Sequence, residues 1–368
     1  MKLRYKILTG IGGVIVLGIV SVMVVTAYDS PCPTISPADP GGETMRALVP
    51  RCYGVANLRI ERVPKPVPKE GQVLIKIHAA SINPAEWYRI SGQPYVIRLA
   101  GGIGAPTDTR AGYDMAGVIE AVGPGVTRFK PGDEVFGGAG GALAEYALAR
   151  EQGGIVLKPS TLTFEEAAGV PIAAVTALEG LRDNGHLAPG QKVLINGASG
   201  GVGTYAVQIA KAMGAEVTAV CSTRNVEMVR SIGADHVIDY TRSDFTQGEV
   251  KYDLILDNVG NHGYLAMVDV TTPGGRIVSV GGQKSNPWLG PISRVIVSRP
   301  LAGLFTDVEL PFFVATIGKE DMEFLAQLAN EGKLRTVIDR RYPLEKTSEA
   351  LEYLGGGRAR GKVIVTVH

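Results

Sequence analysis

The residues best suited to chemistry lie in a glycine-rich turn near the middle of the chain. Val193–Ile195 form a short apolar run that suits a buried parallel strand. Ala198, Gly200 and Gly203 follow it at A-x-G-x-x-G spacing. Small residues at these positions allow a tight turn, a close approach of the backbone to a pyrophosphate, and packing of the next helix on the strand. The alternative is a turn that serves packing alone. We predict a dinucleotide site, built by Ala198, Ser199, Gly200, Gly201, Val202 and Gly203.

The residues after the next apolar stretch, Glu216–Cys221, indicate which nicotinamide cofactor would bind. In NAD-binding folds an Asp or Glu commonly follows the glycines by about 20 residues and holds the ribose 2′-hydroxyl. This chain ends the stretch with Ser222, Thr223 and Arg224 and has no carboxylate there. Hydroxyls and a guanidinium suit a 2′-phosphate. The sequence therefore predicts NADPH over NADH, the alternative being that Arg224 is a solvated surface charge.

Alternating apolar strands and short helices surround this turn. Their lengths and order predict a doubly wound parallel sheet. Ligands bind at the carboxyl ends of the strands in such sheets, which places Asn258, Val259 and Gly281 on the nicotinamide side. Tyr240, at the end of HVIDY, would lie near the adenosine phosphate or would be a packed aromatic. The predicted elements are helices over Val226–Ile232 and around Tyr264–Asp269, and strands over His236–Ile238, Leu254–Asn258 and Gly275–Val280.

The first half of the folded part has a different pattern. Short apolar stretches alternate with Gly- and Pro-containing turns, which is typical of an irregular antiparallel barrel. The predicted strands are Met45–Val49, Leu58–Glu61, Gln72–His78, Gly112–Val122, Asp133–Phe136 and Ala142–Leu148. A chain of 368 residues is long enough for two domains. Its net charge of +1 does not indicate a nucleic-acid-binding protein.

An uncharged apolar run precedes the folded part. Ile7–Ala27 is long enough to cross a bilayer as a helix, and three basic residues precede it. We predict a single-pass membrane anchor over residues 1–28, because the sequence offers only a poor cleavage site for a signal peptide. The positive-inside rule places the folded part across the membrane from the cytoplasm. An NADPH-dependent enzyme needs its reductant, and on that ground we favour the cytoplasm; the sequence leaves the conflict open.

The segment after the anchor is rich in Pro, Ser and Gly. We predict a flexible tether over residues 29–44. Cys32 and Cys52 could pair in an oxidising compartment, although no other feature of the sequence supports this. With Cys221 they form no metal-ligand spacing.

Several motifs carry a family resemblance: HAASINPAEW, AGYDMAGVIEAVGPGVTRFKPGDEVFG, NGASGGVG and the closing RGKVIV. From Met45 to His368 the chain resembles the medium-chain dehydrogenase/reductase superfamily, and within it the zinc-free, quinone-oxidoreductase-like branch. The resemblance implies an α/β fold in which a GroES-like β-barrel catalytic domain (45–160) is followed by a Rossmann domain (161–305). Residues 306–368 would return to the catalytic domain.

The resemblance also bears on metal binding. The zinc-dependent branch has a Cys where this chain has Asn83, and His-Glu where it has Tyr113-Asp114. Its third ligand falls near Ile172–Ala173. Zinc prefers thiolate, imidazole and carboxylate ligands in a tetrahedron. The five histidines are scattered and show no i,i+4 pair. We therefore predict no metal site.

Without a metal the acceptor must take hydride readily, as quinones, enones and activated carbonyls do. The chain would then position the substrate and donate hydrogen bonds to the developing oxyanion. We predict Asn83, Tyr113 and Tyr53 for this role. The resemblance also implies that Thr176 lies beside the nicotinamide, the alternative being a hydroxyl bonded to its own helix.

The roles of two residues and of one apolar surface are open in the sequence. Glu86 would form a salt bridge with Arg89 or a lysine rather than act in catalysis, and Trp87 would be a pocket wall or a core residue. Apolar Ile292–Phe305 would be a lid, a homodimer surface or a membrane contact. The alternative to an enzyme is a non-catalytic, NADPH-binding, membrane-tethered redox sensor or scaffold.

Overall fold

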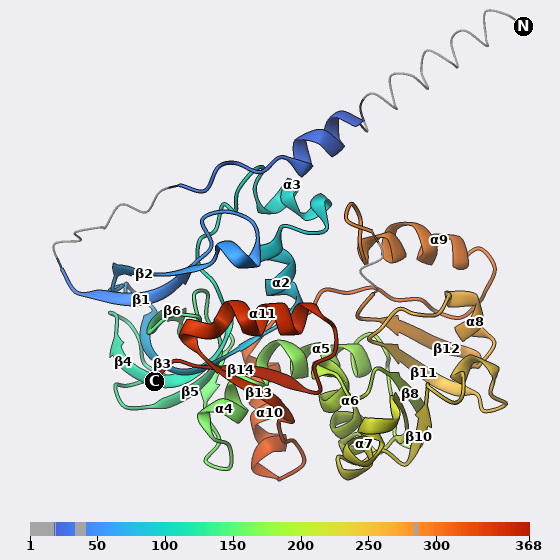
Figure 1. The fold of residues 1–368 in the computed structure, drawn as a ribbon. Helices are drawn as coiled ribbons and strands as arrows, with labels where there is room; N and C mark the ends of the chain where they lie inside the picture. The colour runs from blue at the N-terminus through green and yellow to red at the C-terminus, as the bar shows by residue number, and fades with distance from the viewer. Residues whose placement is uncertain (1–17, 19, 34–41, 283–285) are drawn as a thin grey trace, which may run out of the picture.

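The computed structural model describes residues 18, 20–33, 42–282 and 286–368 (Figure 1). Strands from both ends of the chain form one part, and the middle of the chain forms a helix-covered sheet beside it.

The first part is organised around β3 (Gln72–Ile82), whose residues are mostly buried because strands pair with it on both sides. It runs antiparallel to β4 (Asp114–Val122), β6 (Tyr146–Arg150) and β14 (Lys362–Thr366). The C-terminal strand β14 thus returns to the barrel, as the sequence predicts. The other strands are β1 (Thr44–Val49), β2 (Arg59–Pro64), β5 (Glu134–Gly138), β7 (Ile155–Leu157) and β13 (Ile338–Pro343), and the helices are α2 (Pro84–Ser91), η2 (Tyr95–Ile97), α3 (Arg98–Gly101), α4 (Phe164–Ala168) and α11 (Thr347–Gly355).

The second part is a parallel five-stranded sheet in the order β10-β9-β8-β11-β12, as predicted. Its central strand reads KVLIN and is buried after its first residue, because helices cover both faces of the sheet. The strands are β8 (Lys192–Asn196), β9 (Glu216–Cys221), β10 (His236–Asp239), β11 (Tyr252–Asp257) and β12 (Thr271–Ser279), and the helices are α5 (Pro171–Leu181), α6 (Gly201–Ala212), α7 (Val226–Ser231), α8 (Tyr264–Val268), η5 (Arg294–Ser298), α9 (Arg299–Ala302) and α10 (Lys319–Asn330).

Two local predictions differ from the structure. The apolar segment Thr163–Asp183 predicts one helix that opens with a cap at Thr163. Thr163 does cap a helix with Glu166, but that helix ends after one turn and a second begins at Pro171. A proline is tolerated in the first turn of a helix but not in its interior, which accounts for the break. Residues 306–315 do not return to the barrel at once: Glu309 pairs with Arg276 at the edge of the parallel sheet.

The N-terminal segment is described only from residue 18 onward, apart from residue 19, and residues 20–27 are helical. Much of the predicted span Ile7–Ala27 therefore lies outside the described residues. Within the described part of the chain, no helix has the length and hydropathy to cross a bilayer. Cys32 and Cys52 form a disulfide with a Cα–Cα distance of 5.4 Å. The start of the predicted tether is therefore bonded to the barrel.

Candidate active site

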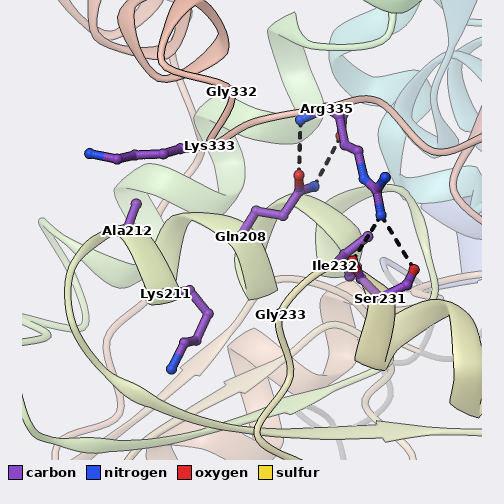
Figure 2. A pocket seen from close by; sticks show the side chains of 9 residues that line it. All are labelled: Gln208, Lys211, Ala212, Ser231, Ile232, Gly233, Gly332, Lys333 and Arg335. Atoms are coloured by element: carbon purple, nitrogen blue, oxygen red, sulfur yellow. Dashed lines mark hydrogen bonds between the residues drawn. The ribbon is translucent and has the colours of Figure 1, made fainter.

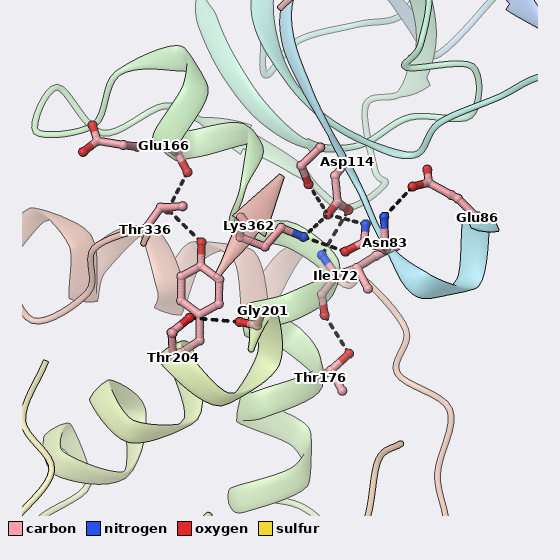
Figure 3. A network of polar contacts seen from close by, with 12 residues as sticks. Asn83, Glu86, Asp114, Glu166, Ile172, Thr176, Gly201, Thr204, Thr336 and Lys362 are labelled. Carbon is pink, nitrogen blue, oxygen red and sulfur yellow. Dashed lines mark hydrogen bonds and ion pairs between the residues drawn. The ribbon is translucent and has the colours of Figure 1, made fainter. Parts of the chain in front are cut away.

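Three polar side chains meet where three adjacent strands begin or end (Figure 3). Asn83 follows β3, Asp114 begins β4 and Lys362 begins β14, and pairing of these strands brings the three together. Lys362 Nζ donates to Asn83 Oδ1 at 2.6 Å and lies 3.6 Å from Asp114 Oδ2. Asn83 Nδ2 donates to the same Asp114 oxygen at 2.9 Å. All three residues are buried, so these contacts replace their hydration.

Asp114 is supported from two further elements. The hydroxyl of Ser81 donates to Oδ2 at 3.1 Å, and the backbone N–H of Ile172 in α5 donates to Oδ1 at 3.1 Å. Burial raises the pKa of Asp114 and lowers the pKa of Lys362, and their mutual attraction opposes both shifts. With four donors around the carboxylate, we assign the pair as ionised.

Glu86 lies beside this group but does not form the predicted salt bridge. One carboxylate oxygen accepts the backbone N–H of Asn83 at 2.8 Å, as part of a capping box for α2. The other, Oε1, is buried without a hydrogen-bond partner among the described residues. Arg89 instead donates to the carbonyls of Asp108 and Arg110. Burial, followed by repulsion from Asp114, raises the pKa of Glu86 to about 7.

The three predicted catalytic residues lie in different environments. Tyr113 is 40% exposed, and its ring packs against Gly138, where a Cβ would lie 2.3 Å from the ring. Tyr53 is buried beneath Arg98 and its hydroxyl donates to the carbonyl of Gly102 at 2.7 Å. Asn83 is buried, and both ends of its side-chain amide are bonded, to Asp114 and to Lys362. Tyr113 is therefore the one of the three whose side chain is free to meet a substrate in this structure.

The glycine-rich turn has the form that the sequence predicts. It joins β8 to α6, whose N-cap is Gly200. A Cβ at Gly203 would lie 2.1 Å from the carbonyl oxygen of Gly197, so only glycine lets the helix pack this closely on the strand end. The backbone N–H of Gly361 donates to the carbonyl of Ser199 at 2.9 Å. The glycine-rich turn therefore contacts the residue just before Lys362, and so lies next to the buried charged group.

The residues predicted on the nicotinamide side lie at the ends of β11 and β12 and on α5. A Cβ at Gly281 would lie 2.2 Å from the carbonyl oxygen of Asn258. The side-chain amide Nδ2 of Asn258 donates to the backbone carbonyl of Asn196 at 3.0 Å. Val259 is 36% exposed, and its backbone N–H donates to Asp257. The Thr176 hydroxyl donates to the carbonyl of Ile172 at 2.6 Å, the helix-internal bond that was the alternative for this residue. Its oxygen keeps the capacity to accept a bond from a ligand.

The residues predicted around the adenosine phosphate lie at the ends of β9 and β10. Arg224 is exposed and donates to the carbonyl of Arg358 at 3.1 Å, and Tyr240 is 59% exposed. The backbone between Ser222 and Asn225 closes a short turn. The sequence does not reveal a carboxylate here, but Asp239 comes from the neighbouring strand and accepts the Thr223 hydroxyl at 2.6 Å. Asp239 therefore brings a negative charge next to Thr223, the neighbour of Arg224, and lies 3.5 Å from the guanidinium of Arg242.

A separate depression lies at the other end of α6 (Figure 2). Gln208 exchanges hydrogen bonds with the backbone of Arg335, whose guanidinium donates to Ser231. Lys211 pairs with Asp235. Contacts within the protein engage these polar groups, and no predicted site residue lines the depression.

Sequence reasoning missed Lys362. Lys362 belongs to the motif RGKVIV, which at the level of sequence marks only the end of the chain's family resemblance. The neighbouring residues do not indicate that the lysine is buried or that it has a charged partner. The only signal was an unusual one: a lysine begins an apolar strand that the sequence predicts to lie inside the barrel.

Metal ligands are few around the buried group. Asn83, Tyr113 and Ile172 provide an amide, a phenol and an aliphatic side chain, and the Lys362 ammonium already lies between Asn83 and Asp114. Among the described residues, no cluster of three or more His, Cys, Asp or Glu side chains could hold a metal ion.

Comparison with known proteins identifies the family. Residues 69–160 match the alcohol dehydrogenase GroES-like domain, and residues 232–365 match the family described as zinc-binding dehydrogenase. The chain is 34% identical to a chloroplast envelope quinone oxidoreductase homolog of Arabidopsis thaliana over 341 residues, which covers 88% of this chain and 99% of the relative. It is 36% identical to a 2-methylene-furan-3-one reductase of Solanum lycopersicum over 329 residues, covering 85% and 76% of the two chains.

The fold agrees with solved structures. The quinone oxidoreductase from Coxiella burnetii superposes with a TM-score of 0.76 at 29% identity, covering 89% of this chain and all of the other. The glycine-rich turn, the returning strand and these matches together assign the chain. It is an oxidoreductase that uses a nicotinamide cofactor, and it belongs to the medium-chain dehydrogenase/reductase superfamily, among its quinone-oxidoreductase-like members.

Proposed function

We propose that this protein is an NADPH-dependent oxidoreductase that reduces a quinone, an enone or an activated carbonyl without zinc. The observation that carries the proposal is the Lys362 ammonium, which lies between Asn83 and Asp114, where the zinc-dependent relatives would hold a metal. The names of the relatives, quinone oxidoreductase and 2-methylene-furan-3-one reductase, support the same acceptor classes.

The residues present fit a nicotinamide dinucleotide. The amides at the start of α6 and the glycine turn would hold the pyrophosphate, because the N-terminus of a helix favours an anion. The bound cofactor would supply hydride. Tyr113 would donate its phenolic proton in a hydrogen bond to the acceptor oxygen, because 40% of its surface is exposed to solvent. The burial of the rest of the side chain raises the pKa of the phenol, which keeps it protonated. Asn83 and Lys362, which bond to each other and both contact Asp114, would hold this wall of the site in place. Tyr53 would have a packing role beneath Arg98, since its hydroxyl already donates to the carbonyl of Gly102.

A turnover screen tests this proposal against the scaffold alternative. NADPH consumption by the purified protein is measured with quinones, enones and aldehydes, alongside NADPH binding. We expect turnover with at least one of these acceptor classes. Tight NADPH binding with no turnover in any class would favour the scaffold.

Cofactor preference rests on Arg224. Replacing it by alanine should weaken NADPH binding by about 1–3 kcal/mol, the range for a hydrogen bond to a charged group, and leave NADH binding nearly unchanged. Asp239→Asn should act in the opposite direction, because it removes a negative charge beside the 2′-phosphate. Calorimetric titration with both cofactors measures this, with Arg230→Ala on α7 as the matched control. Equal losses for the two cofactors, or tighter binding of NADH by the unchanged protein, would contradict the assignment.

Metal analysis provides an independent test. The purified protein should contain well under one zinc per chain, and chelator treatment should leave its turnover unchanged, because an amide, a phenol and an aliphatic side chain stand at the ligand positions. A zinc-dependent alcohol dehydrogenase treated in parallel would lose activity. Stoichiometric zinc, or turnover that the chelator abolishes, would overturn the zinc-free part of the proposal.

We also propose that residues 7–27 anchor the protein in a membrane. The full-length chain should sediment with membranes and resist carbonate extraction, whereas a chain starting at Glu43 should be released and still bind NADPH. The Cys32–Cys52 disulfide and the basic tip favour the oxidising side of the membrane, whereas the need for NADPH favours the cytoplasmic side. Protease protection in sealed vesicles tests the side. Recovery of a mature chain that lacks the first ~30 residues would identify a cleaved signal peptide instead.

A further inference from the structure

We propose that one face of the folded part, formed by the helix at residues 20–27, by η2–α3 and by η5–α9, lies against the lipid bilayer. The protein would then sit on the membrane in one fixed orientation instead of moving freely on a tether. This inference rests on the proposed membrane attachment of residues 7–27.

The first observation is that the end of the N-terminal helix is fixed to the barrel. Arg98 is only 2% exposed, and its Nη1 donates to the carbonyls of Thr26 and Tyr28 at 3.2 and 3.0 Å and to the Asp29 carboxylate at 2.9 Å. The same guanidinium lies over the rings of Tyr53 and Tyr95, 4.2 and 4.8 Å from their centroids. Because these bonds fix residues 26–29 to Arg98, the N-terminal helix meets the folded part at one defined position on its surface.

Two further bonds hold the residues that follow. The backbone N–H of Ser30 donates to the carbonyl of Gly104 at 2.9 Å, and the disulfide joins Cys32 to Cys52. The chain therefore follows the barrel surface from residue 26 to residue 32. If residues 7–27 enter a bilayer, the surface around Arg98 must lie next to that bilayer, because only a few residues separate them.

The second observation is that this surface is apolar. Leu99 in α3 and Ile103 after it are exposed beside the N-terminal helix. Figure 1 shows α9 on the same side of the molecule as α3 and that helix. Leu304 and Phe305, just after α9, are 75% and 73% exposed. The other exposed apolar side chains of this face are Val20, Val22, Val24 and Val25 in the N-terminal helix and Ile296, Val297 and Leu301 in η5–α9.

Contacts join the two halves of the face. The backbone N–H groups of Tyr95 and Val96 in η2 donate to the carbonyls of Pro287 and Trp288 at 2.7 and 3.0 Å. The rings of Tyr95 and Trp288 lie 5.0 Å apart. The segment leading to η5–α9 is thereby packed on the segment leading to α3. Exposed apolar side chains gathered on one side of a protein, on segments that contact each other, mark an interaction site.

A bilayer is the occupant that these features favour. The apolar run that ends at Ala27 leads directly into the face. Tyr28, Tyr95 and Trp288 lie around the base of the helix, and amphipathic aromatic side chains are enriched where a membrane meets water. The exposed apolar residues of α3 and η5–α9 would then enter the interfacial layer, as those of a surface-lying amphipathic helix do.

The test uses the full-length chain in phosphatidylcholine vesicles that contain lipids with a spin label on the acyl chain. A fluorophore is attached at Leu304→Cys or, in the control, at Leu157→Cys. Leu157 is also exposed but lies beside α10, on the other side of the molecule in Figure 1. The native cysteines do not compete for the label, since Cys221 is buried and the other two are paired.

We expect the spin-labelled lipid to quench the label at position 304 at least twofold and to leave the label at position 157 unchanged. A chain that floats with the vesicles while neither label is quenched would retain the membrane anchor and overturn the docking face. A chain that does not float would overturn both proposals. Energy transfer between labels at position 304 on different copies, without quenching by lipid, would identify a second copy as the occupant and contradict the inference.

Discussion

Replacing Lys362 by methionine is expected to lower the free energy of unfolding by about 3–5 kcal/mol, the range for a buried ion pair that loses one partner. Methionine fills a similar volume, so the effect would come from the charge. Asp114, fully buried, would keep its bonds from Asn83, Ser81 and Ile172 but lose the ammonium of its ion pair. Urea denaturation at pH 7.5 measures the loss.

The matched control for this variant is Lys346→Met, since the Lys346 side chain is 57% exposed and forms an exposed ion pair with Glu349 at 3.7 Å. Its effect should stay within about 0.5 kcal/mol. Asp114→Asn in the Lys362→Met background should recover part of the stability, because it removes the unpaired charge. A loss below about 1 kcal/mol for Lys362→Met, or no recovery in the double variant, would show that the buried group is not an ion pair.

Glu86→Gln is expected to stabilise the protein at pH 8 by roughly 1–3 kcal/mol. The pKa of Glu86 is raised from 4.5 to about 7 in the folded protein, so between these values the native state binds more protons than the unfolded state. The free energy of unfolding therefore falls as the pH rises through this window. Above pH 7 the folded protein carries the full penalty of burying the ionised carboxylate. Glutamine carries no charge and can still accept the Asn83 N–H, so it removes the cost.

Denaturation of both proteins at several values between pH 5 and pH 8 checks this prediction. The gain from Glu86→Gln should be small at pH 5 and grow toward pH 8, whereas Glu249→Gln, on the exposed surface, should change little at any pH. The same gain at every pH, or a loss that grows with pH, would mean that Glu86 has a partner in solution that holds it ionised.

Local patterns in the sequence were enough for the parallel sheet, the glycine turn and the capped helix at Thr163. In each case neighbours within a few residues decide the structure: Gly203 must lack a side chain to pack on Gly197, and Glu166 caps the helix that Thr163 begins. The returning strand was predicted from a family motif, which carries long-range information that periodicity lacks.

The polar contacts of the candidate site could not be predicted in this way. Lys362 lies 279 residues from Asn83, and the two meet only because β14 pairs with β3. In the same way, Asp239 at the end of β10 contacts Thr223 just after β9 because these two strands are paired. Glu86 was expected to form a salt bridge with Arg89 or a lysine, but its carboxylate instead accepts the backbone N–H of Asn83 at the start of α2. Long-range pairing and local competition for a side chain decide these contacts.

The central claim is that this chain transfers hydride from NADPH to an activated acceptor without a metal. The most direct measurement treats the full-length protein with a chelator and then supplies NADPH that carries deuterium at both C4 positions, together with an enone that the turnover screen identifies. Mass spectrometry and NMR then locate the deuterium in the product. We expect a saturated ketone with one deuterium on the carbon β to the carbonyl, formed at the rate of the untreated protein. A reduced product without deuterium, or turnover that returns only when zinc is restored, would contradict it.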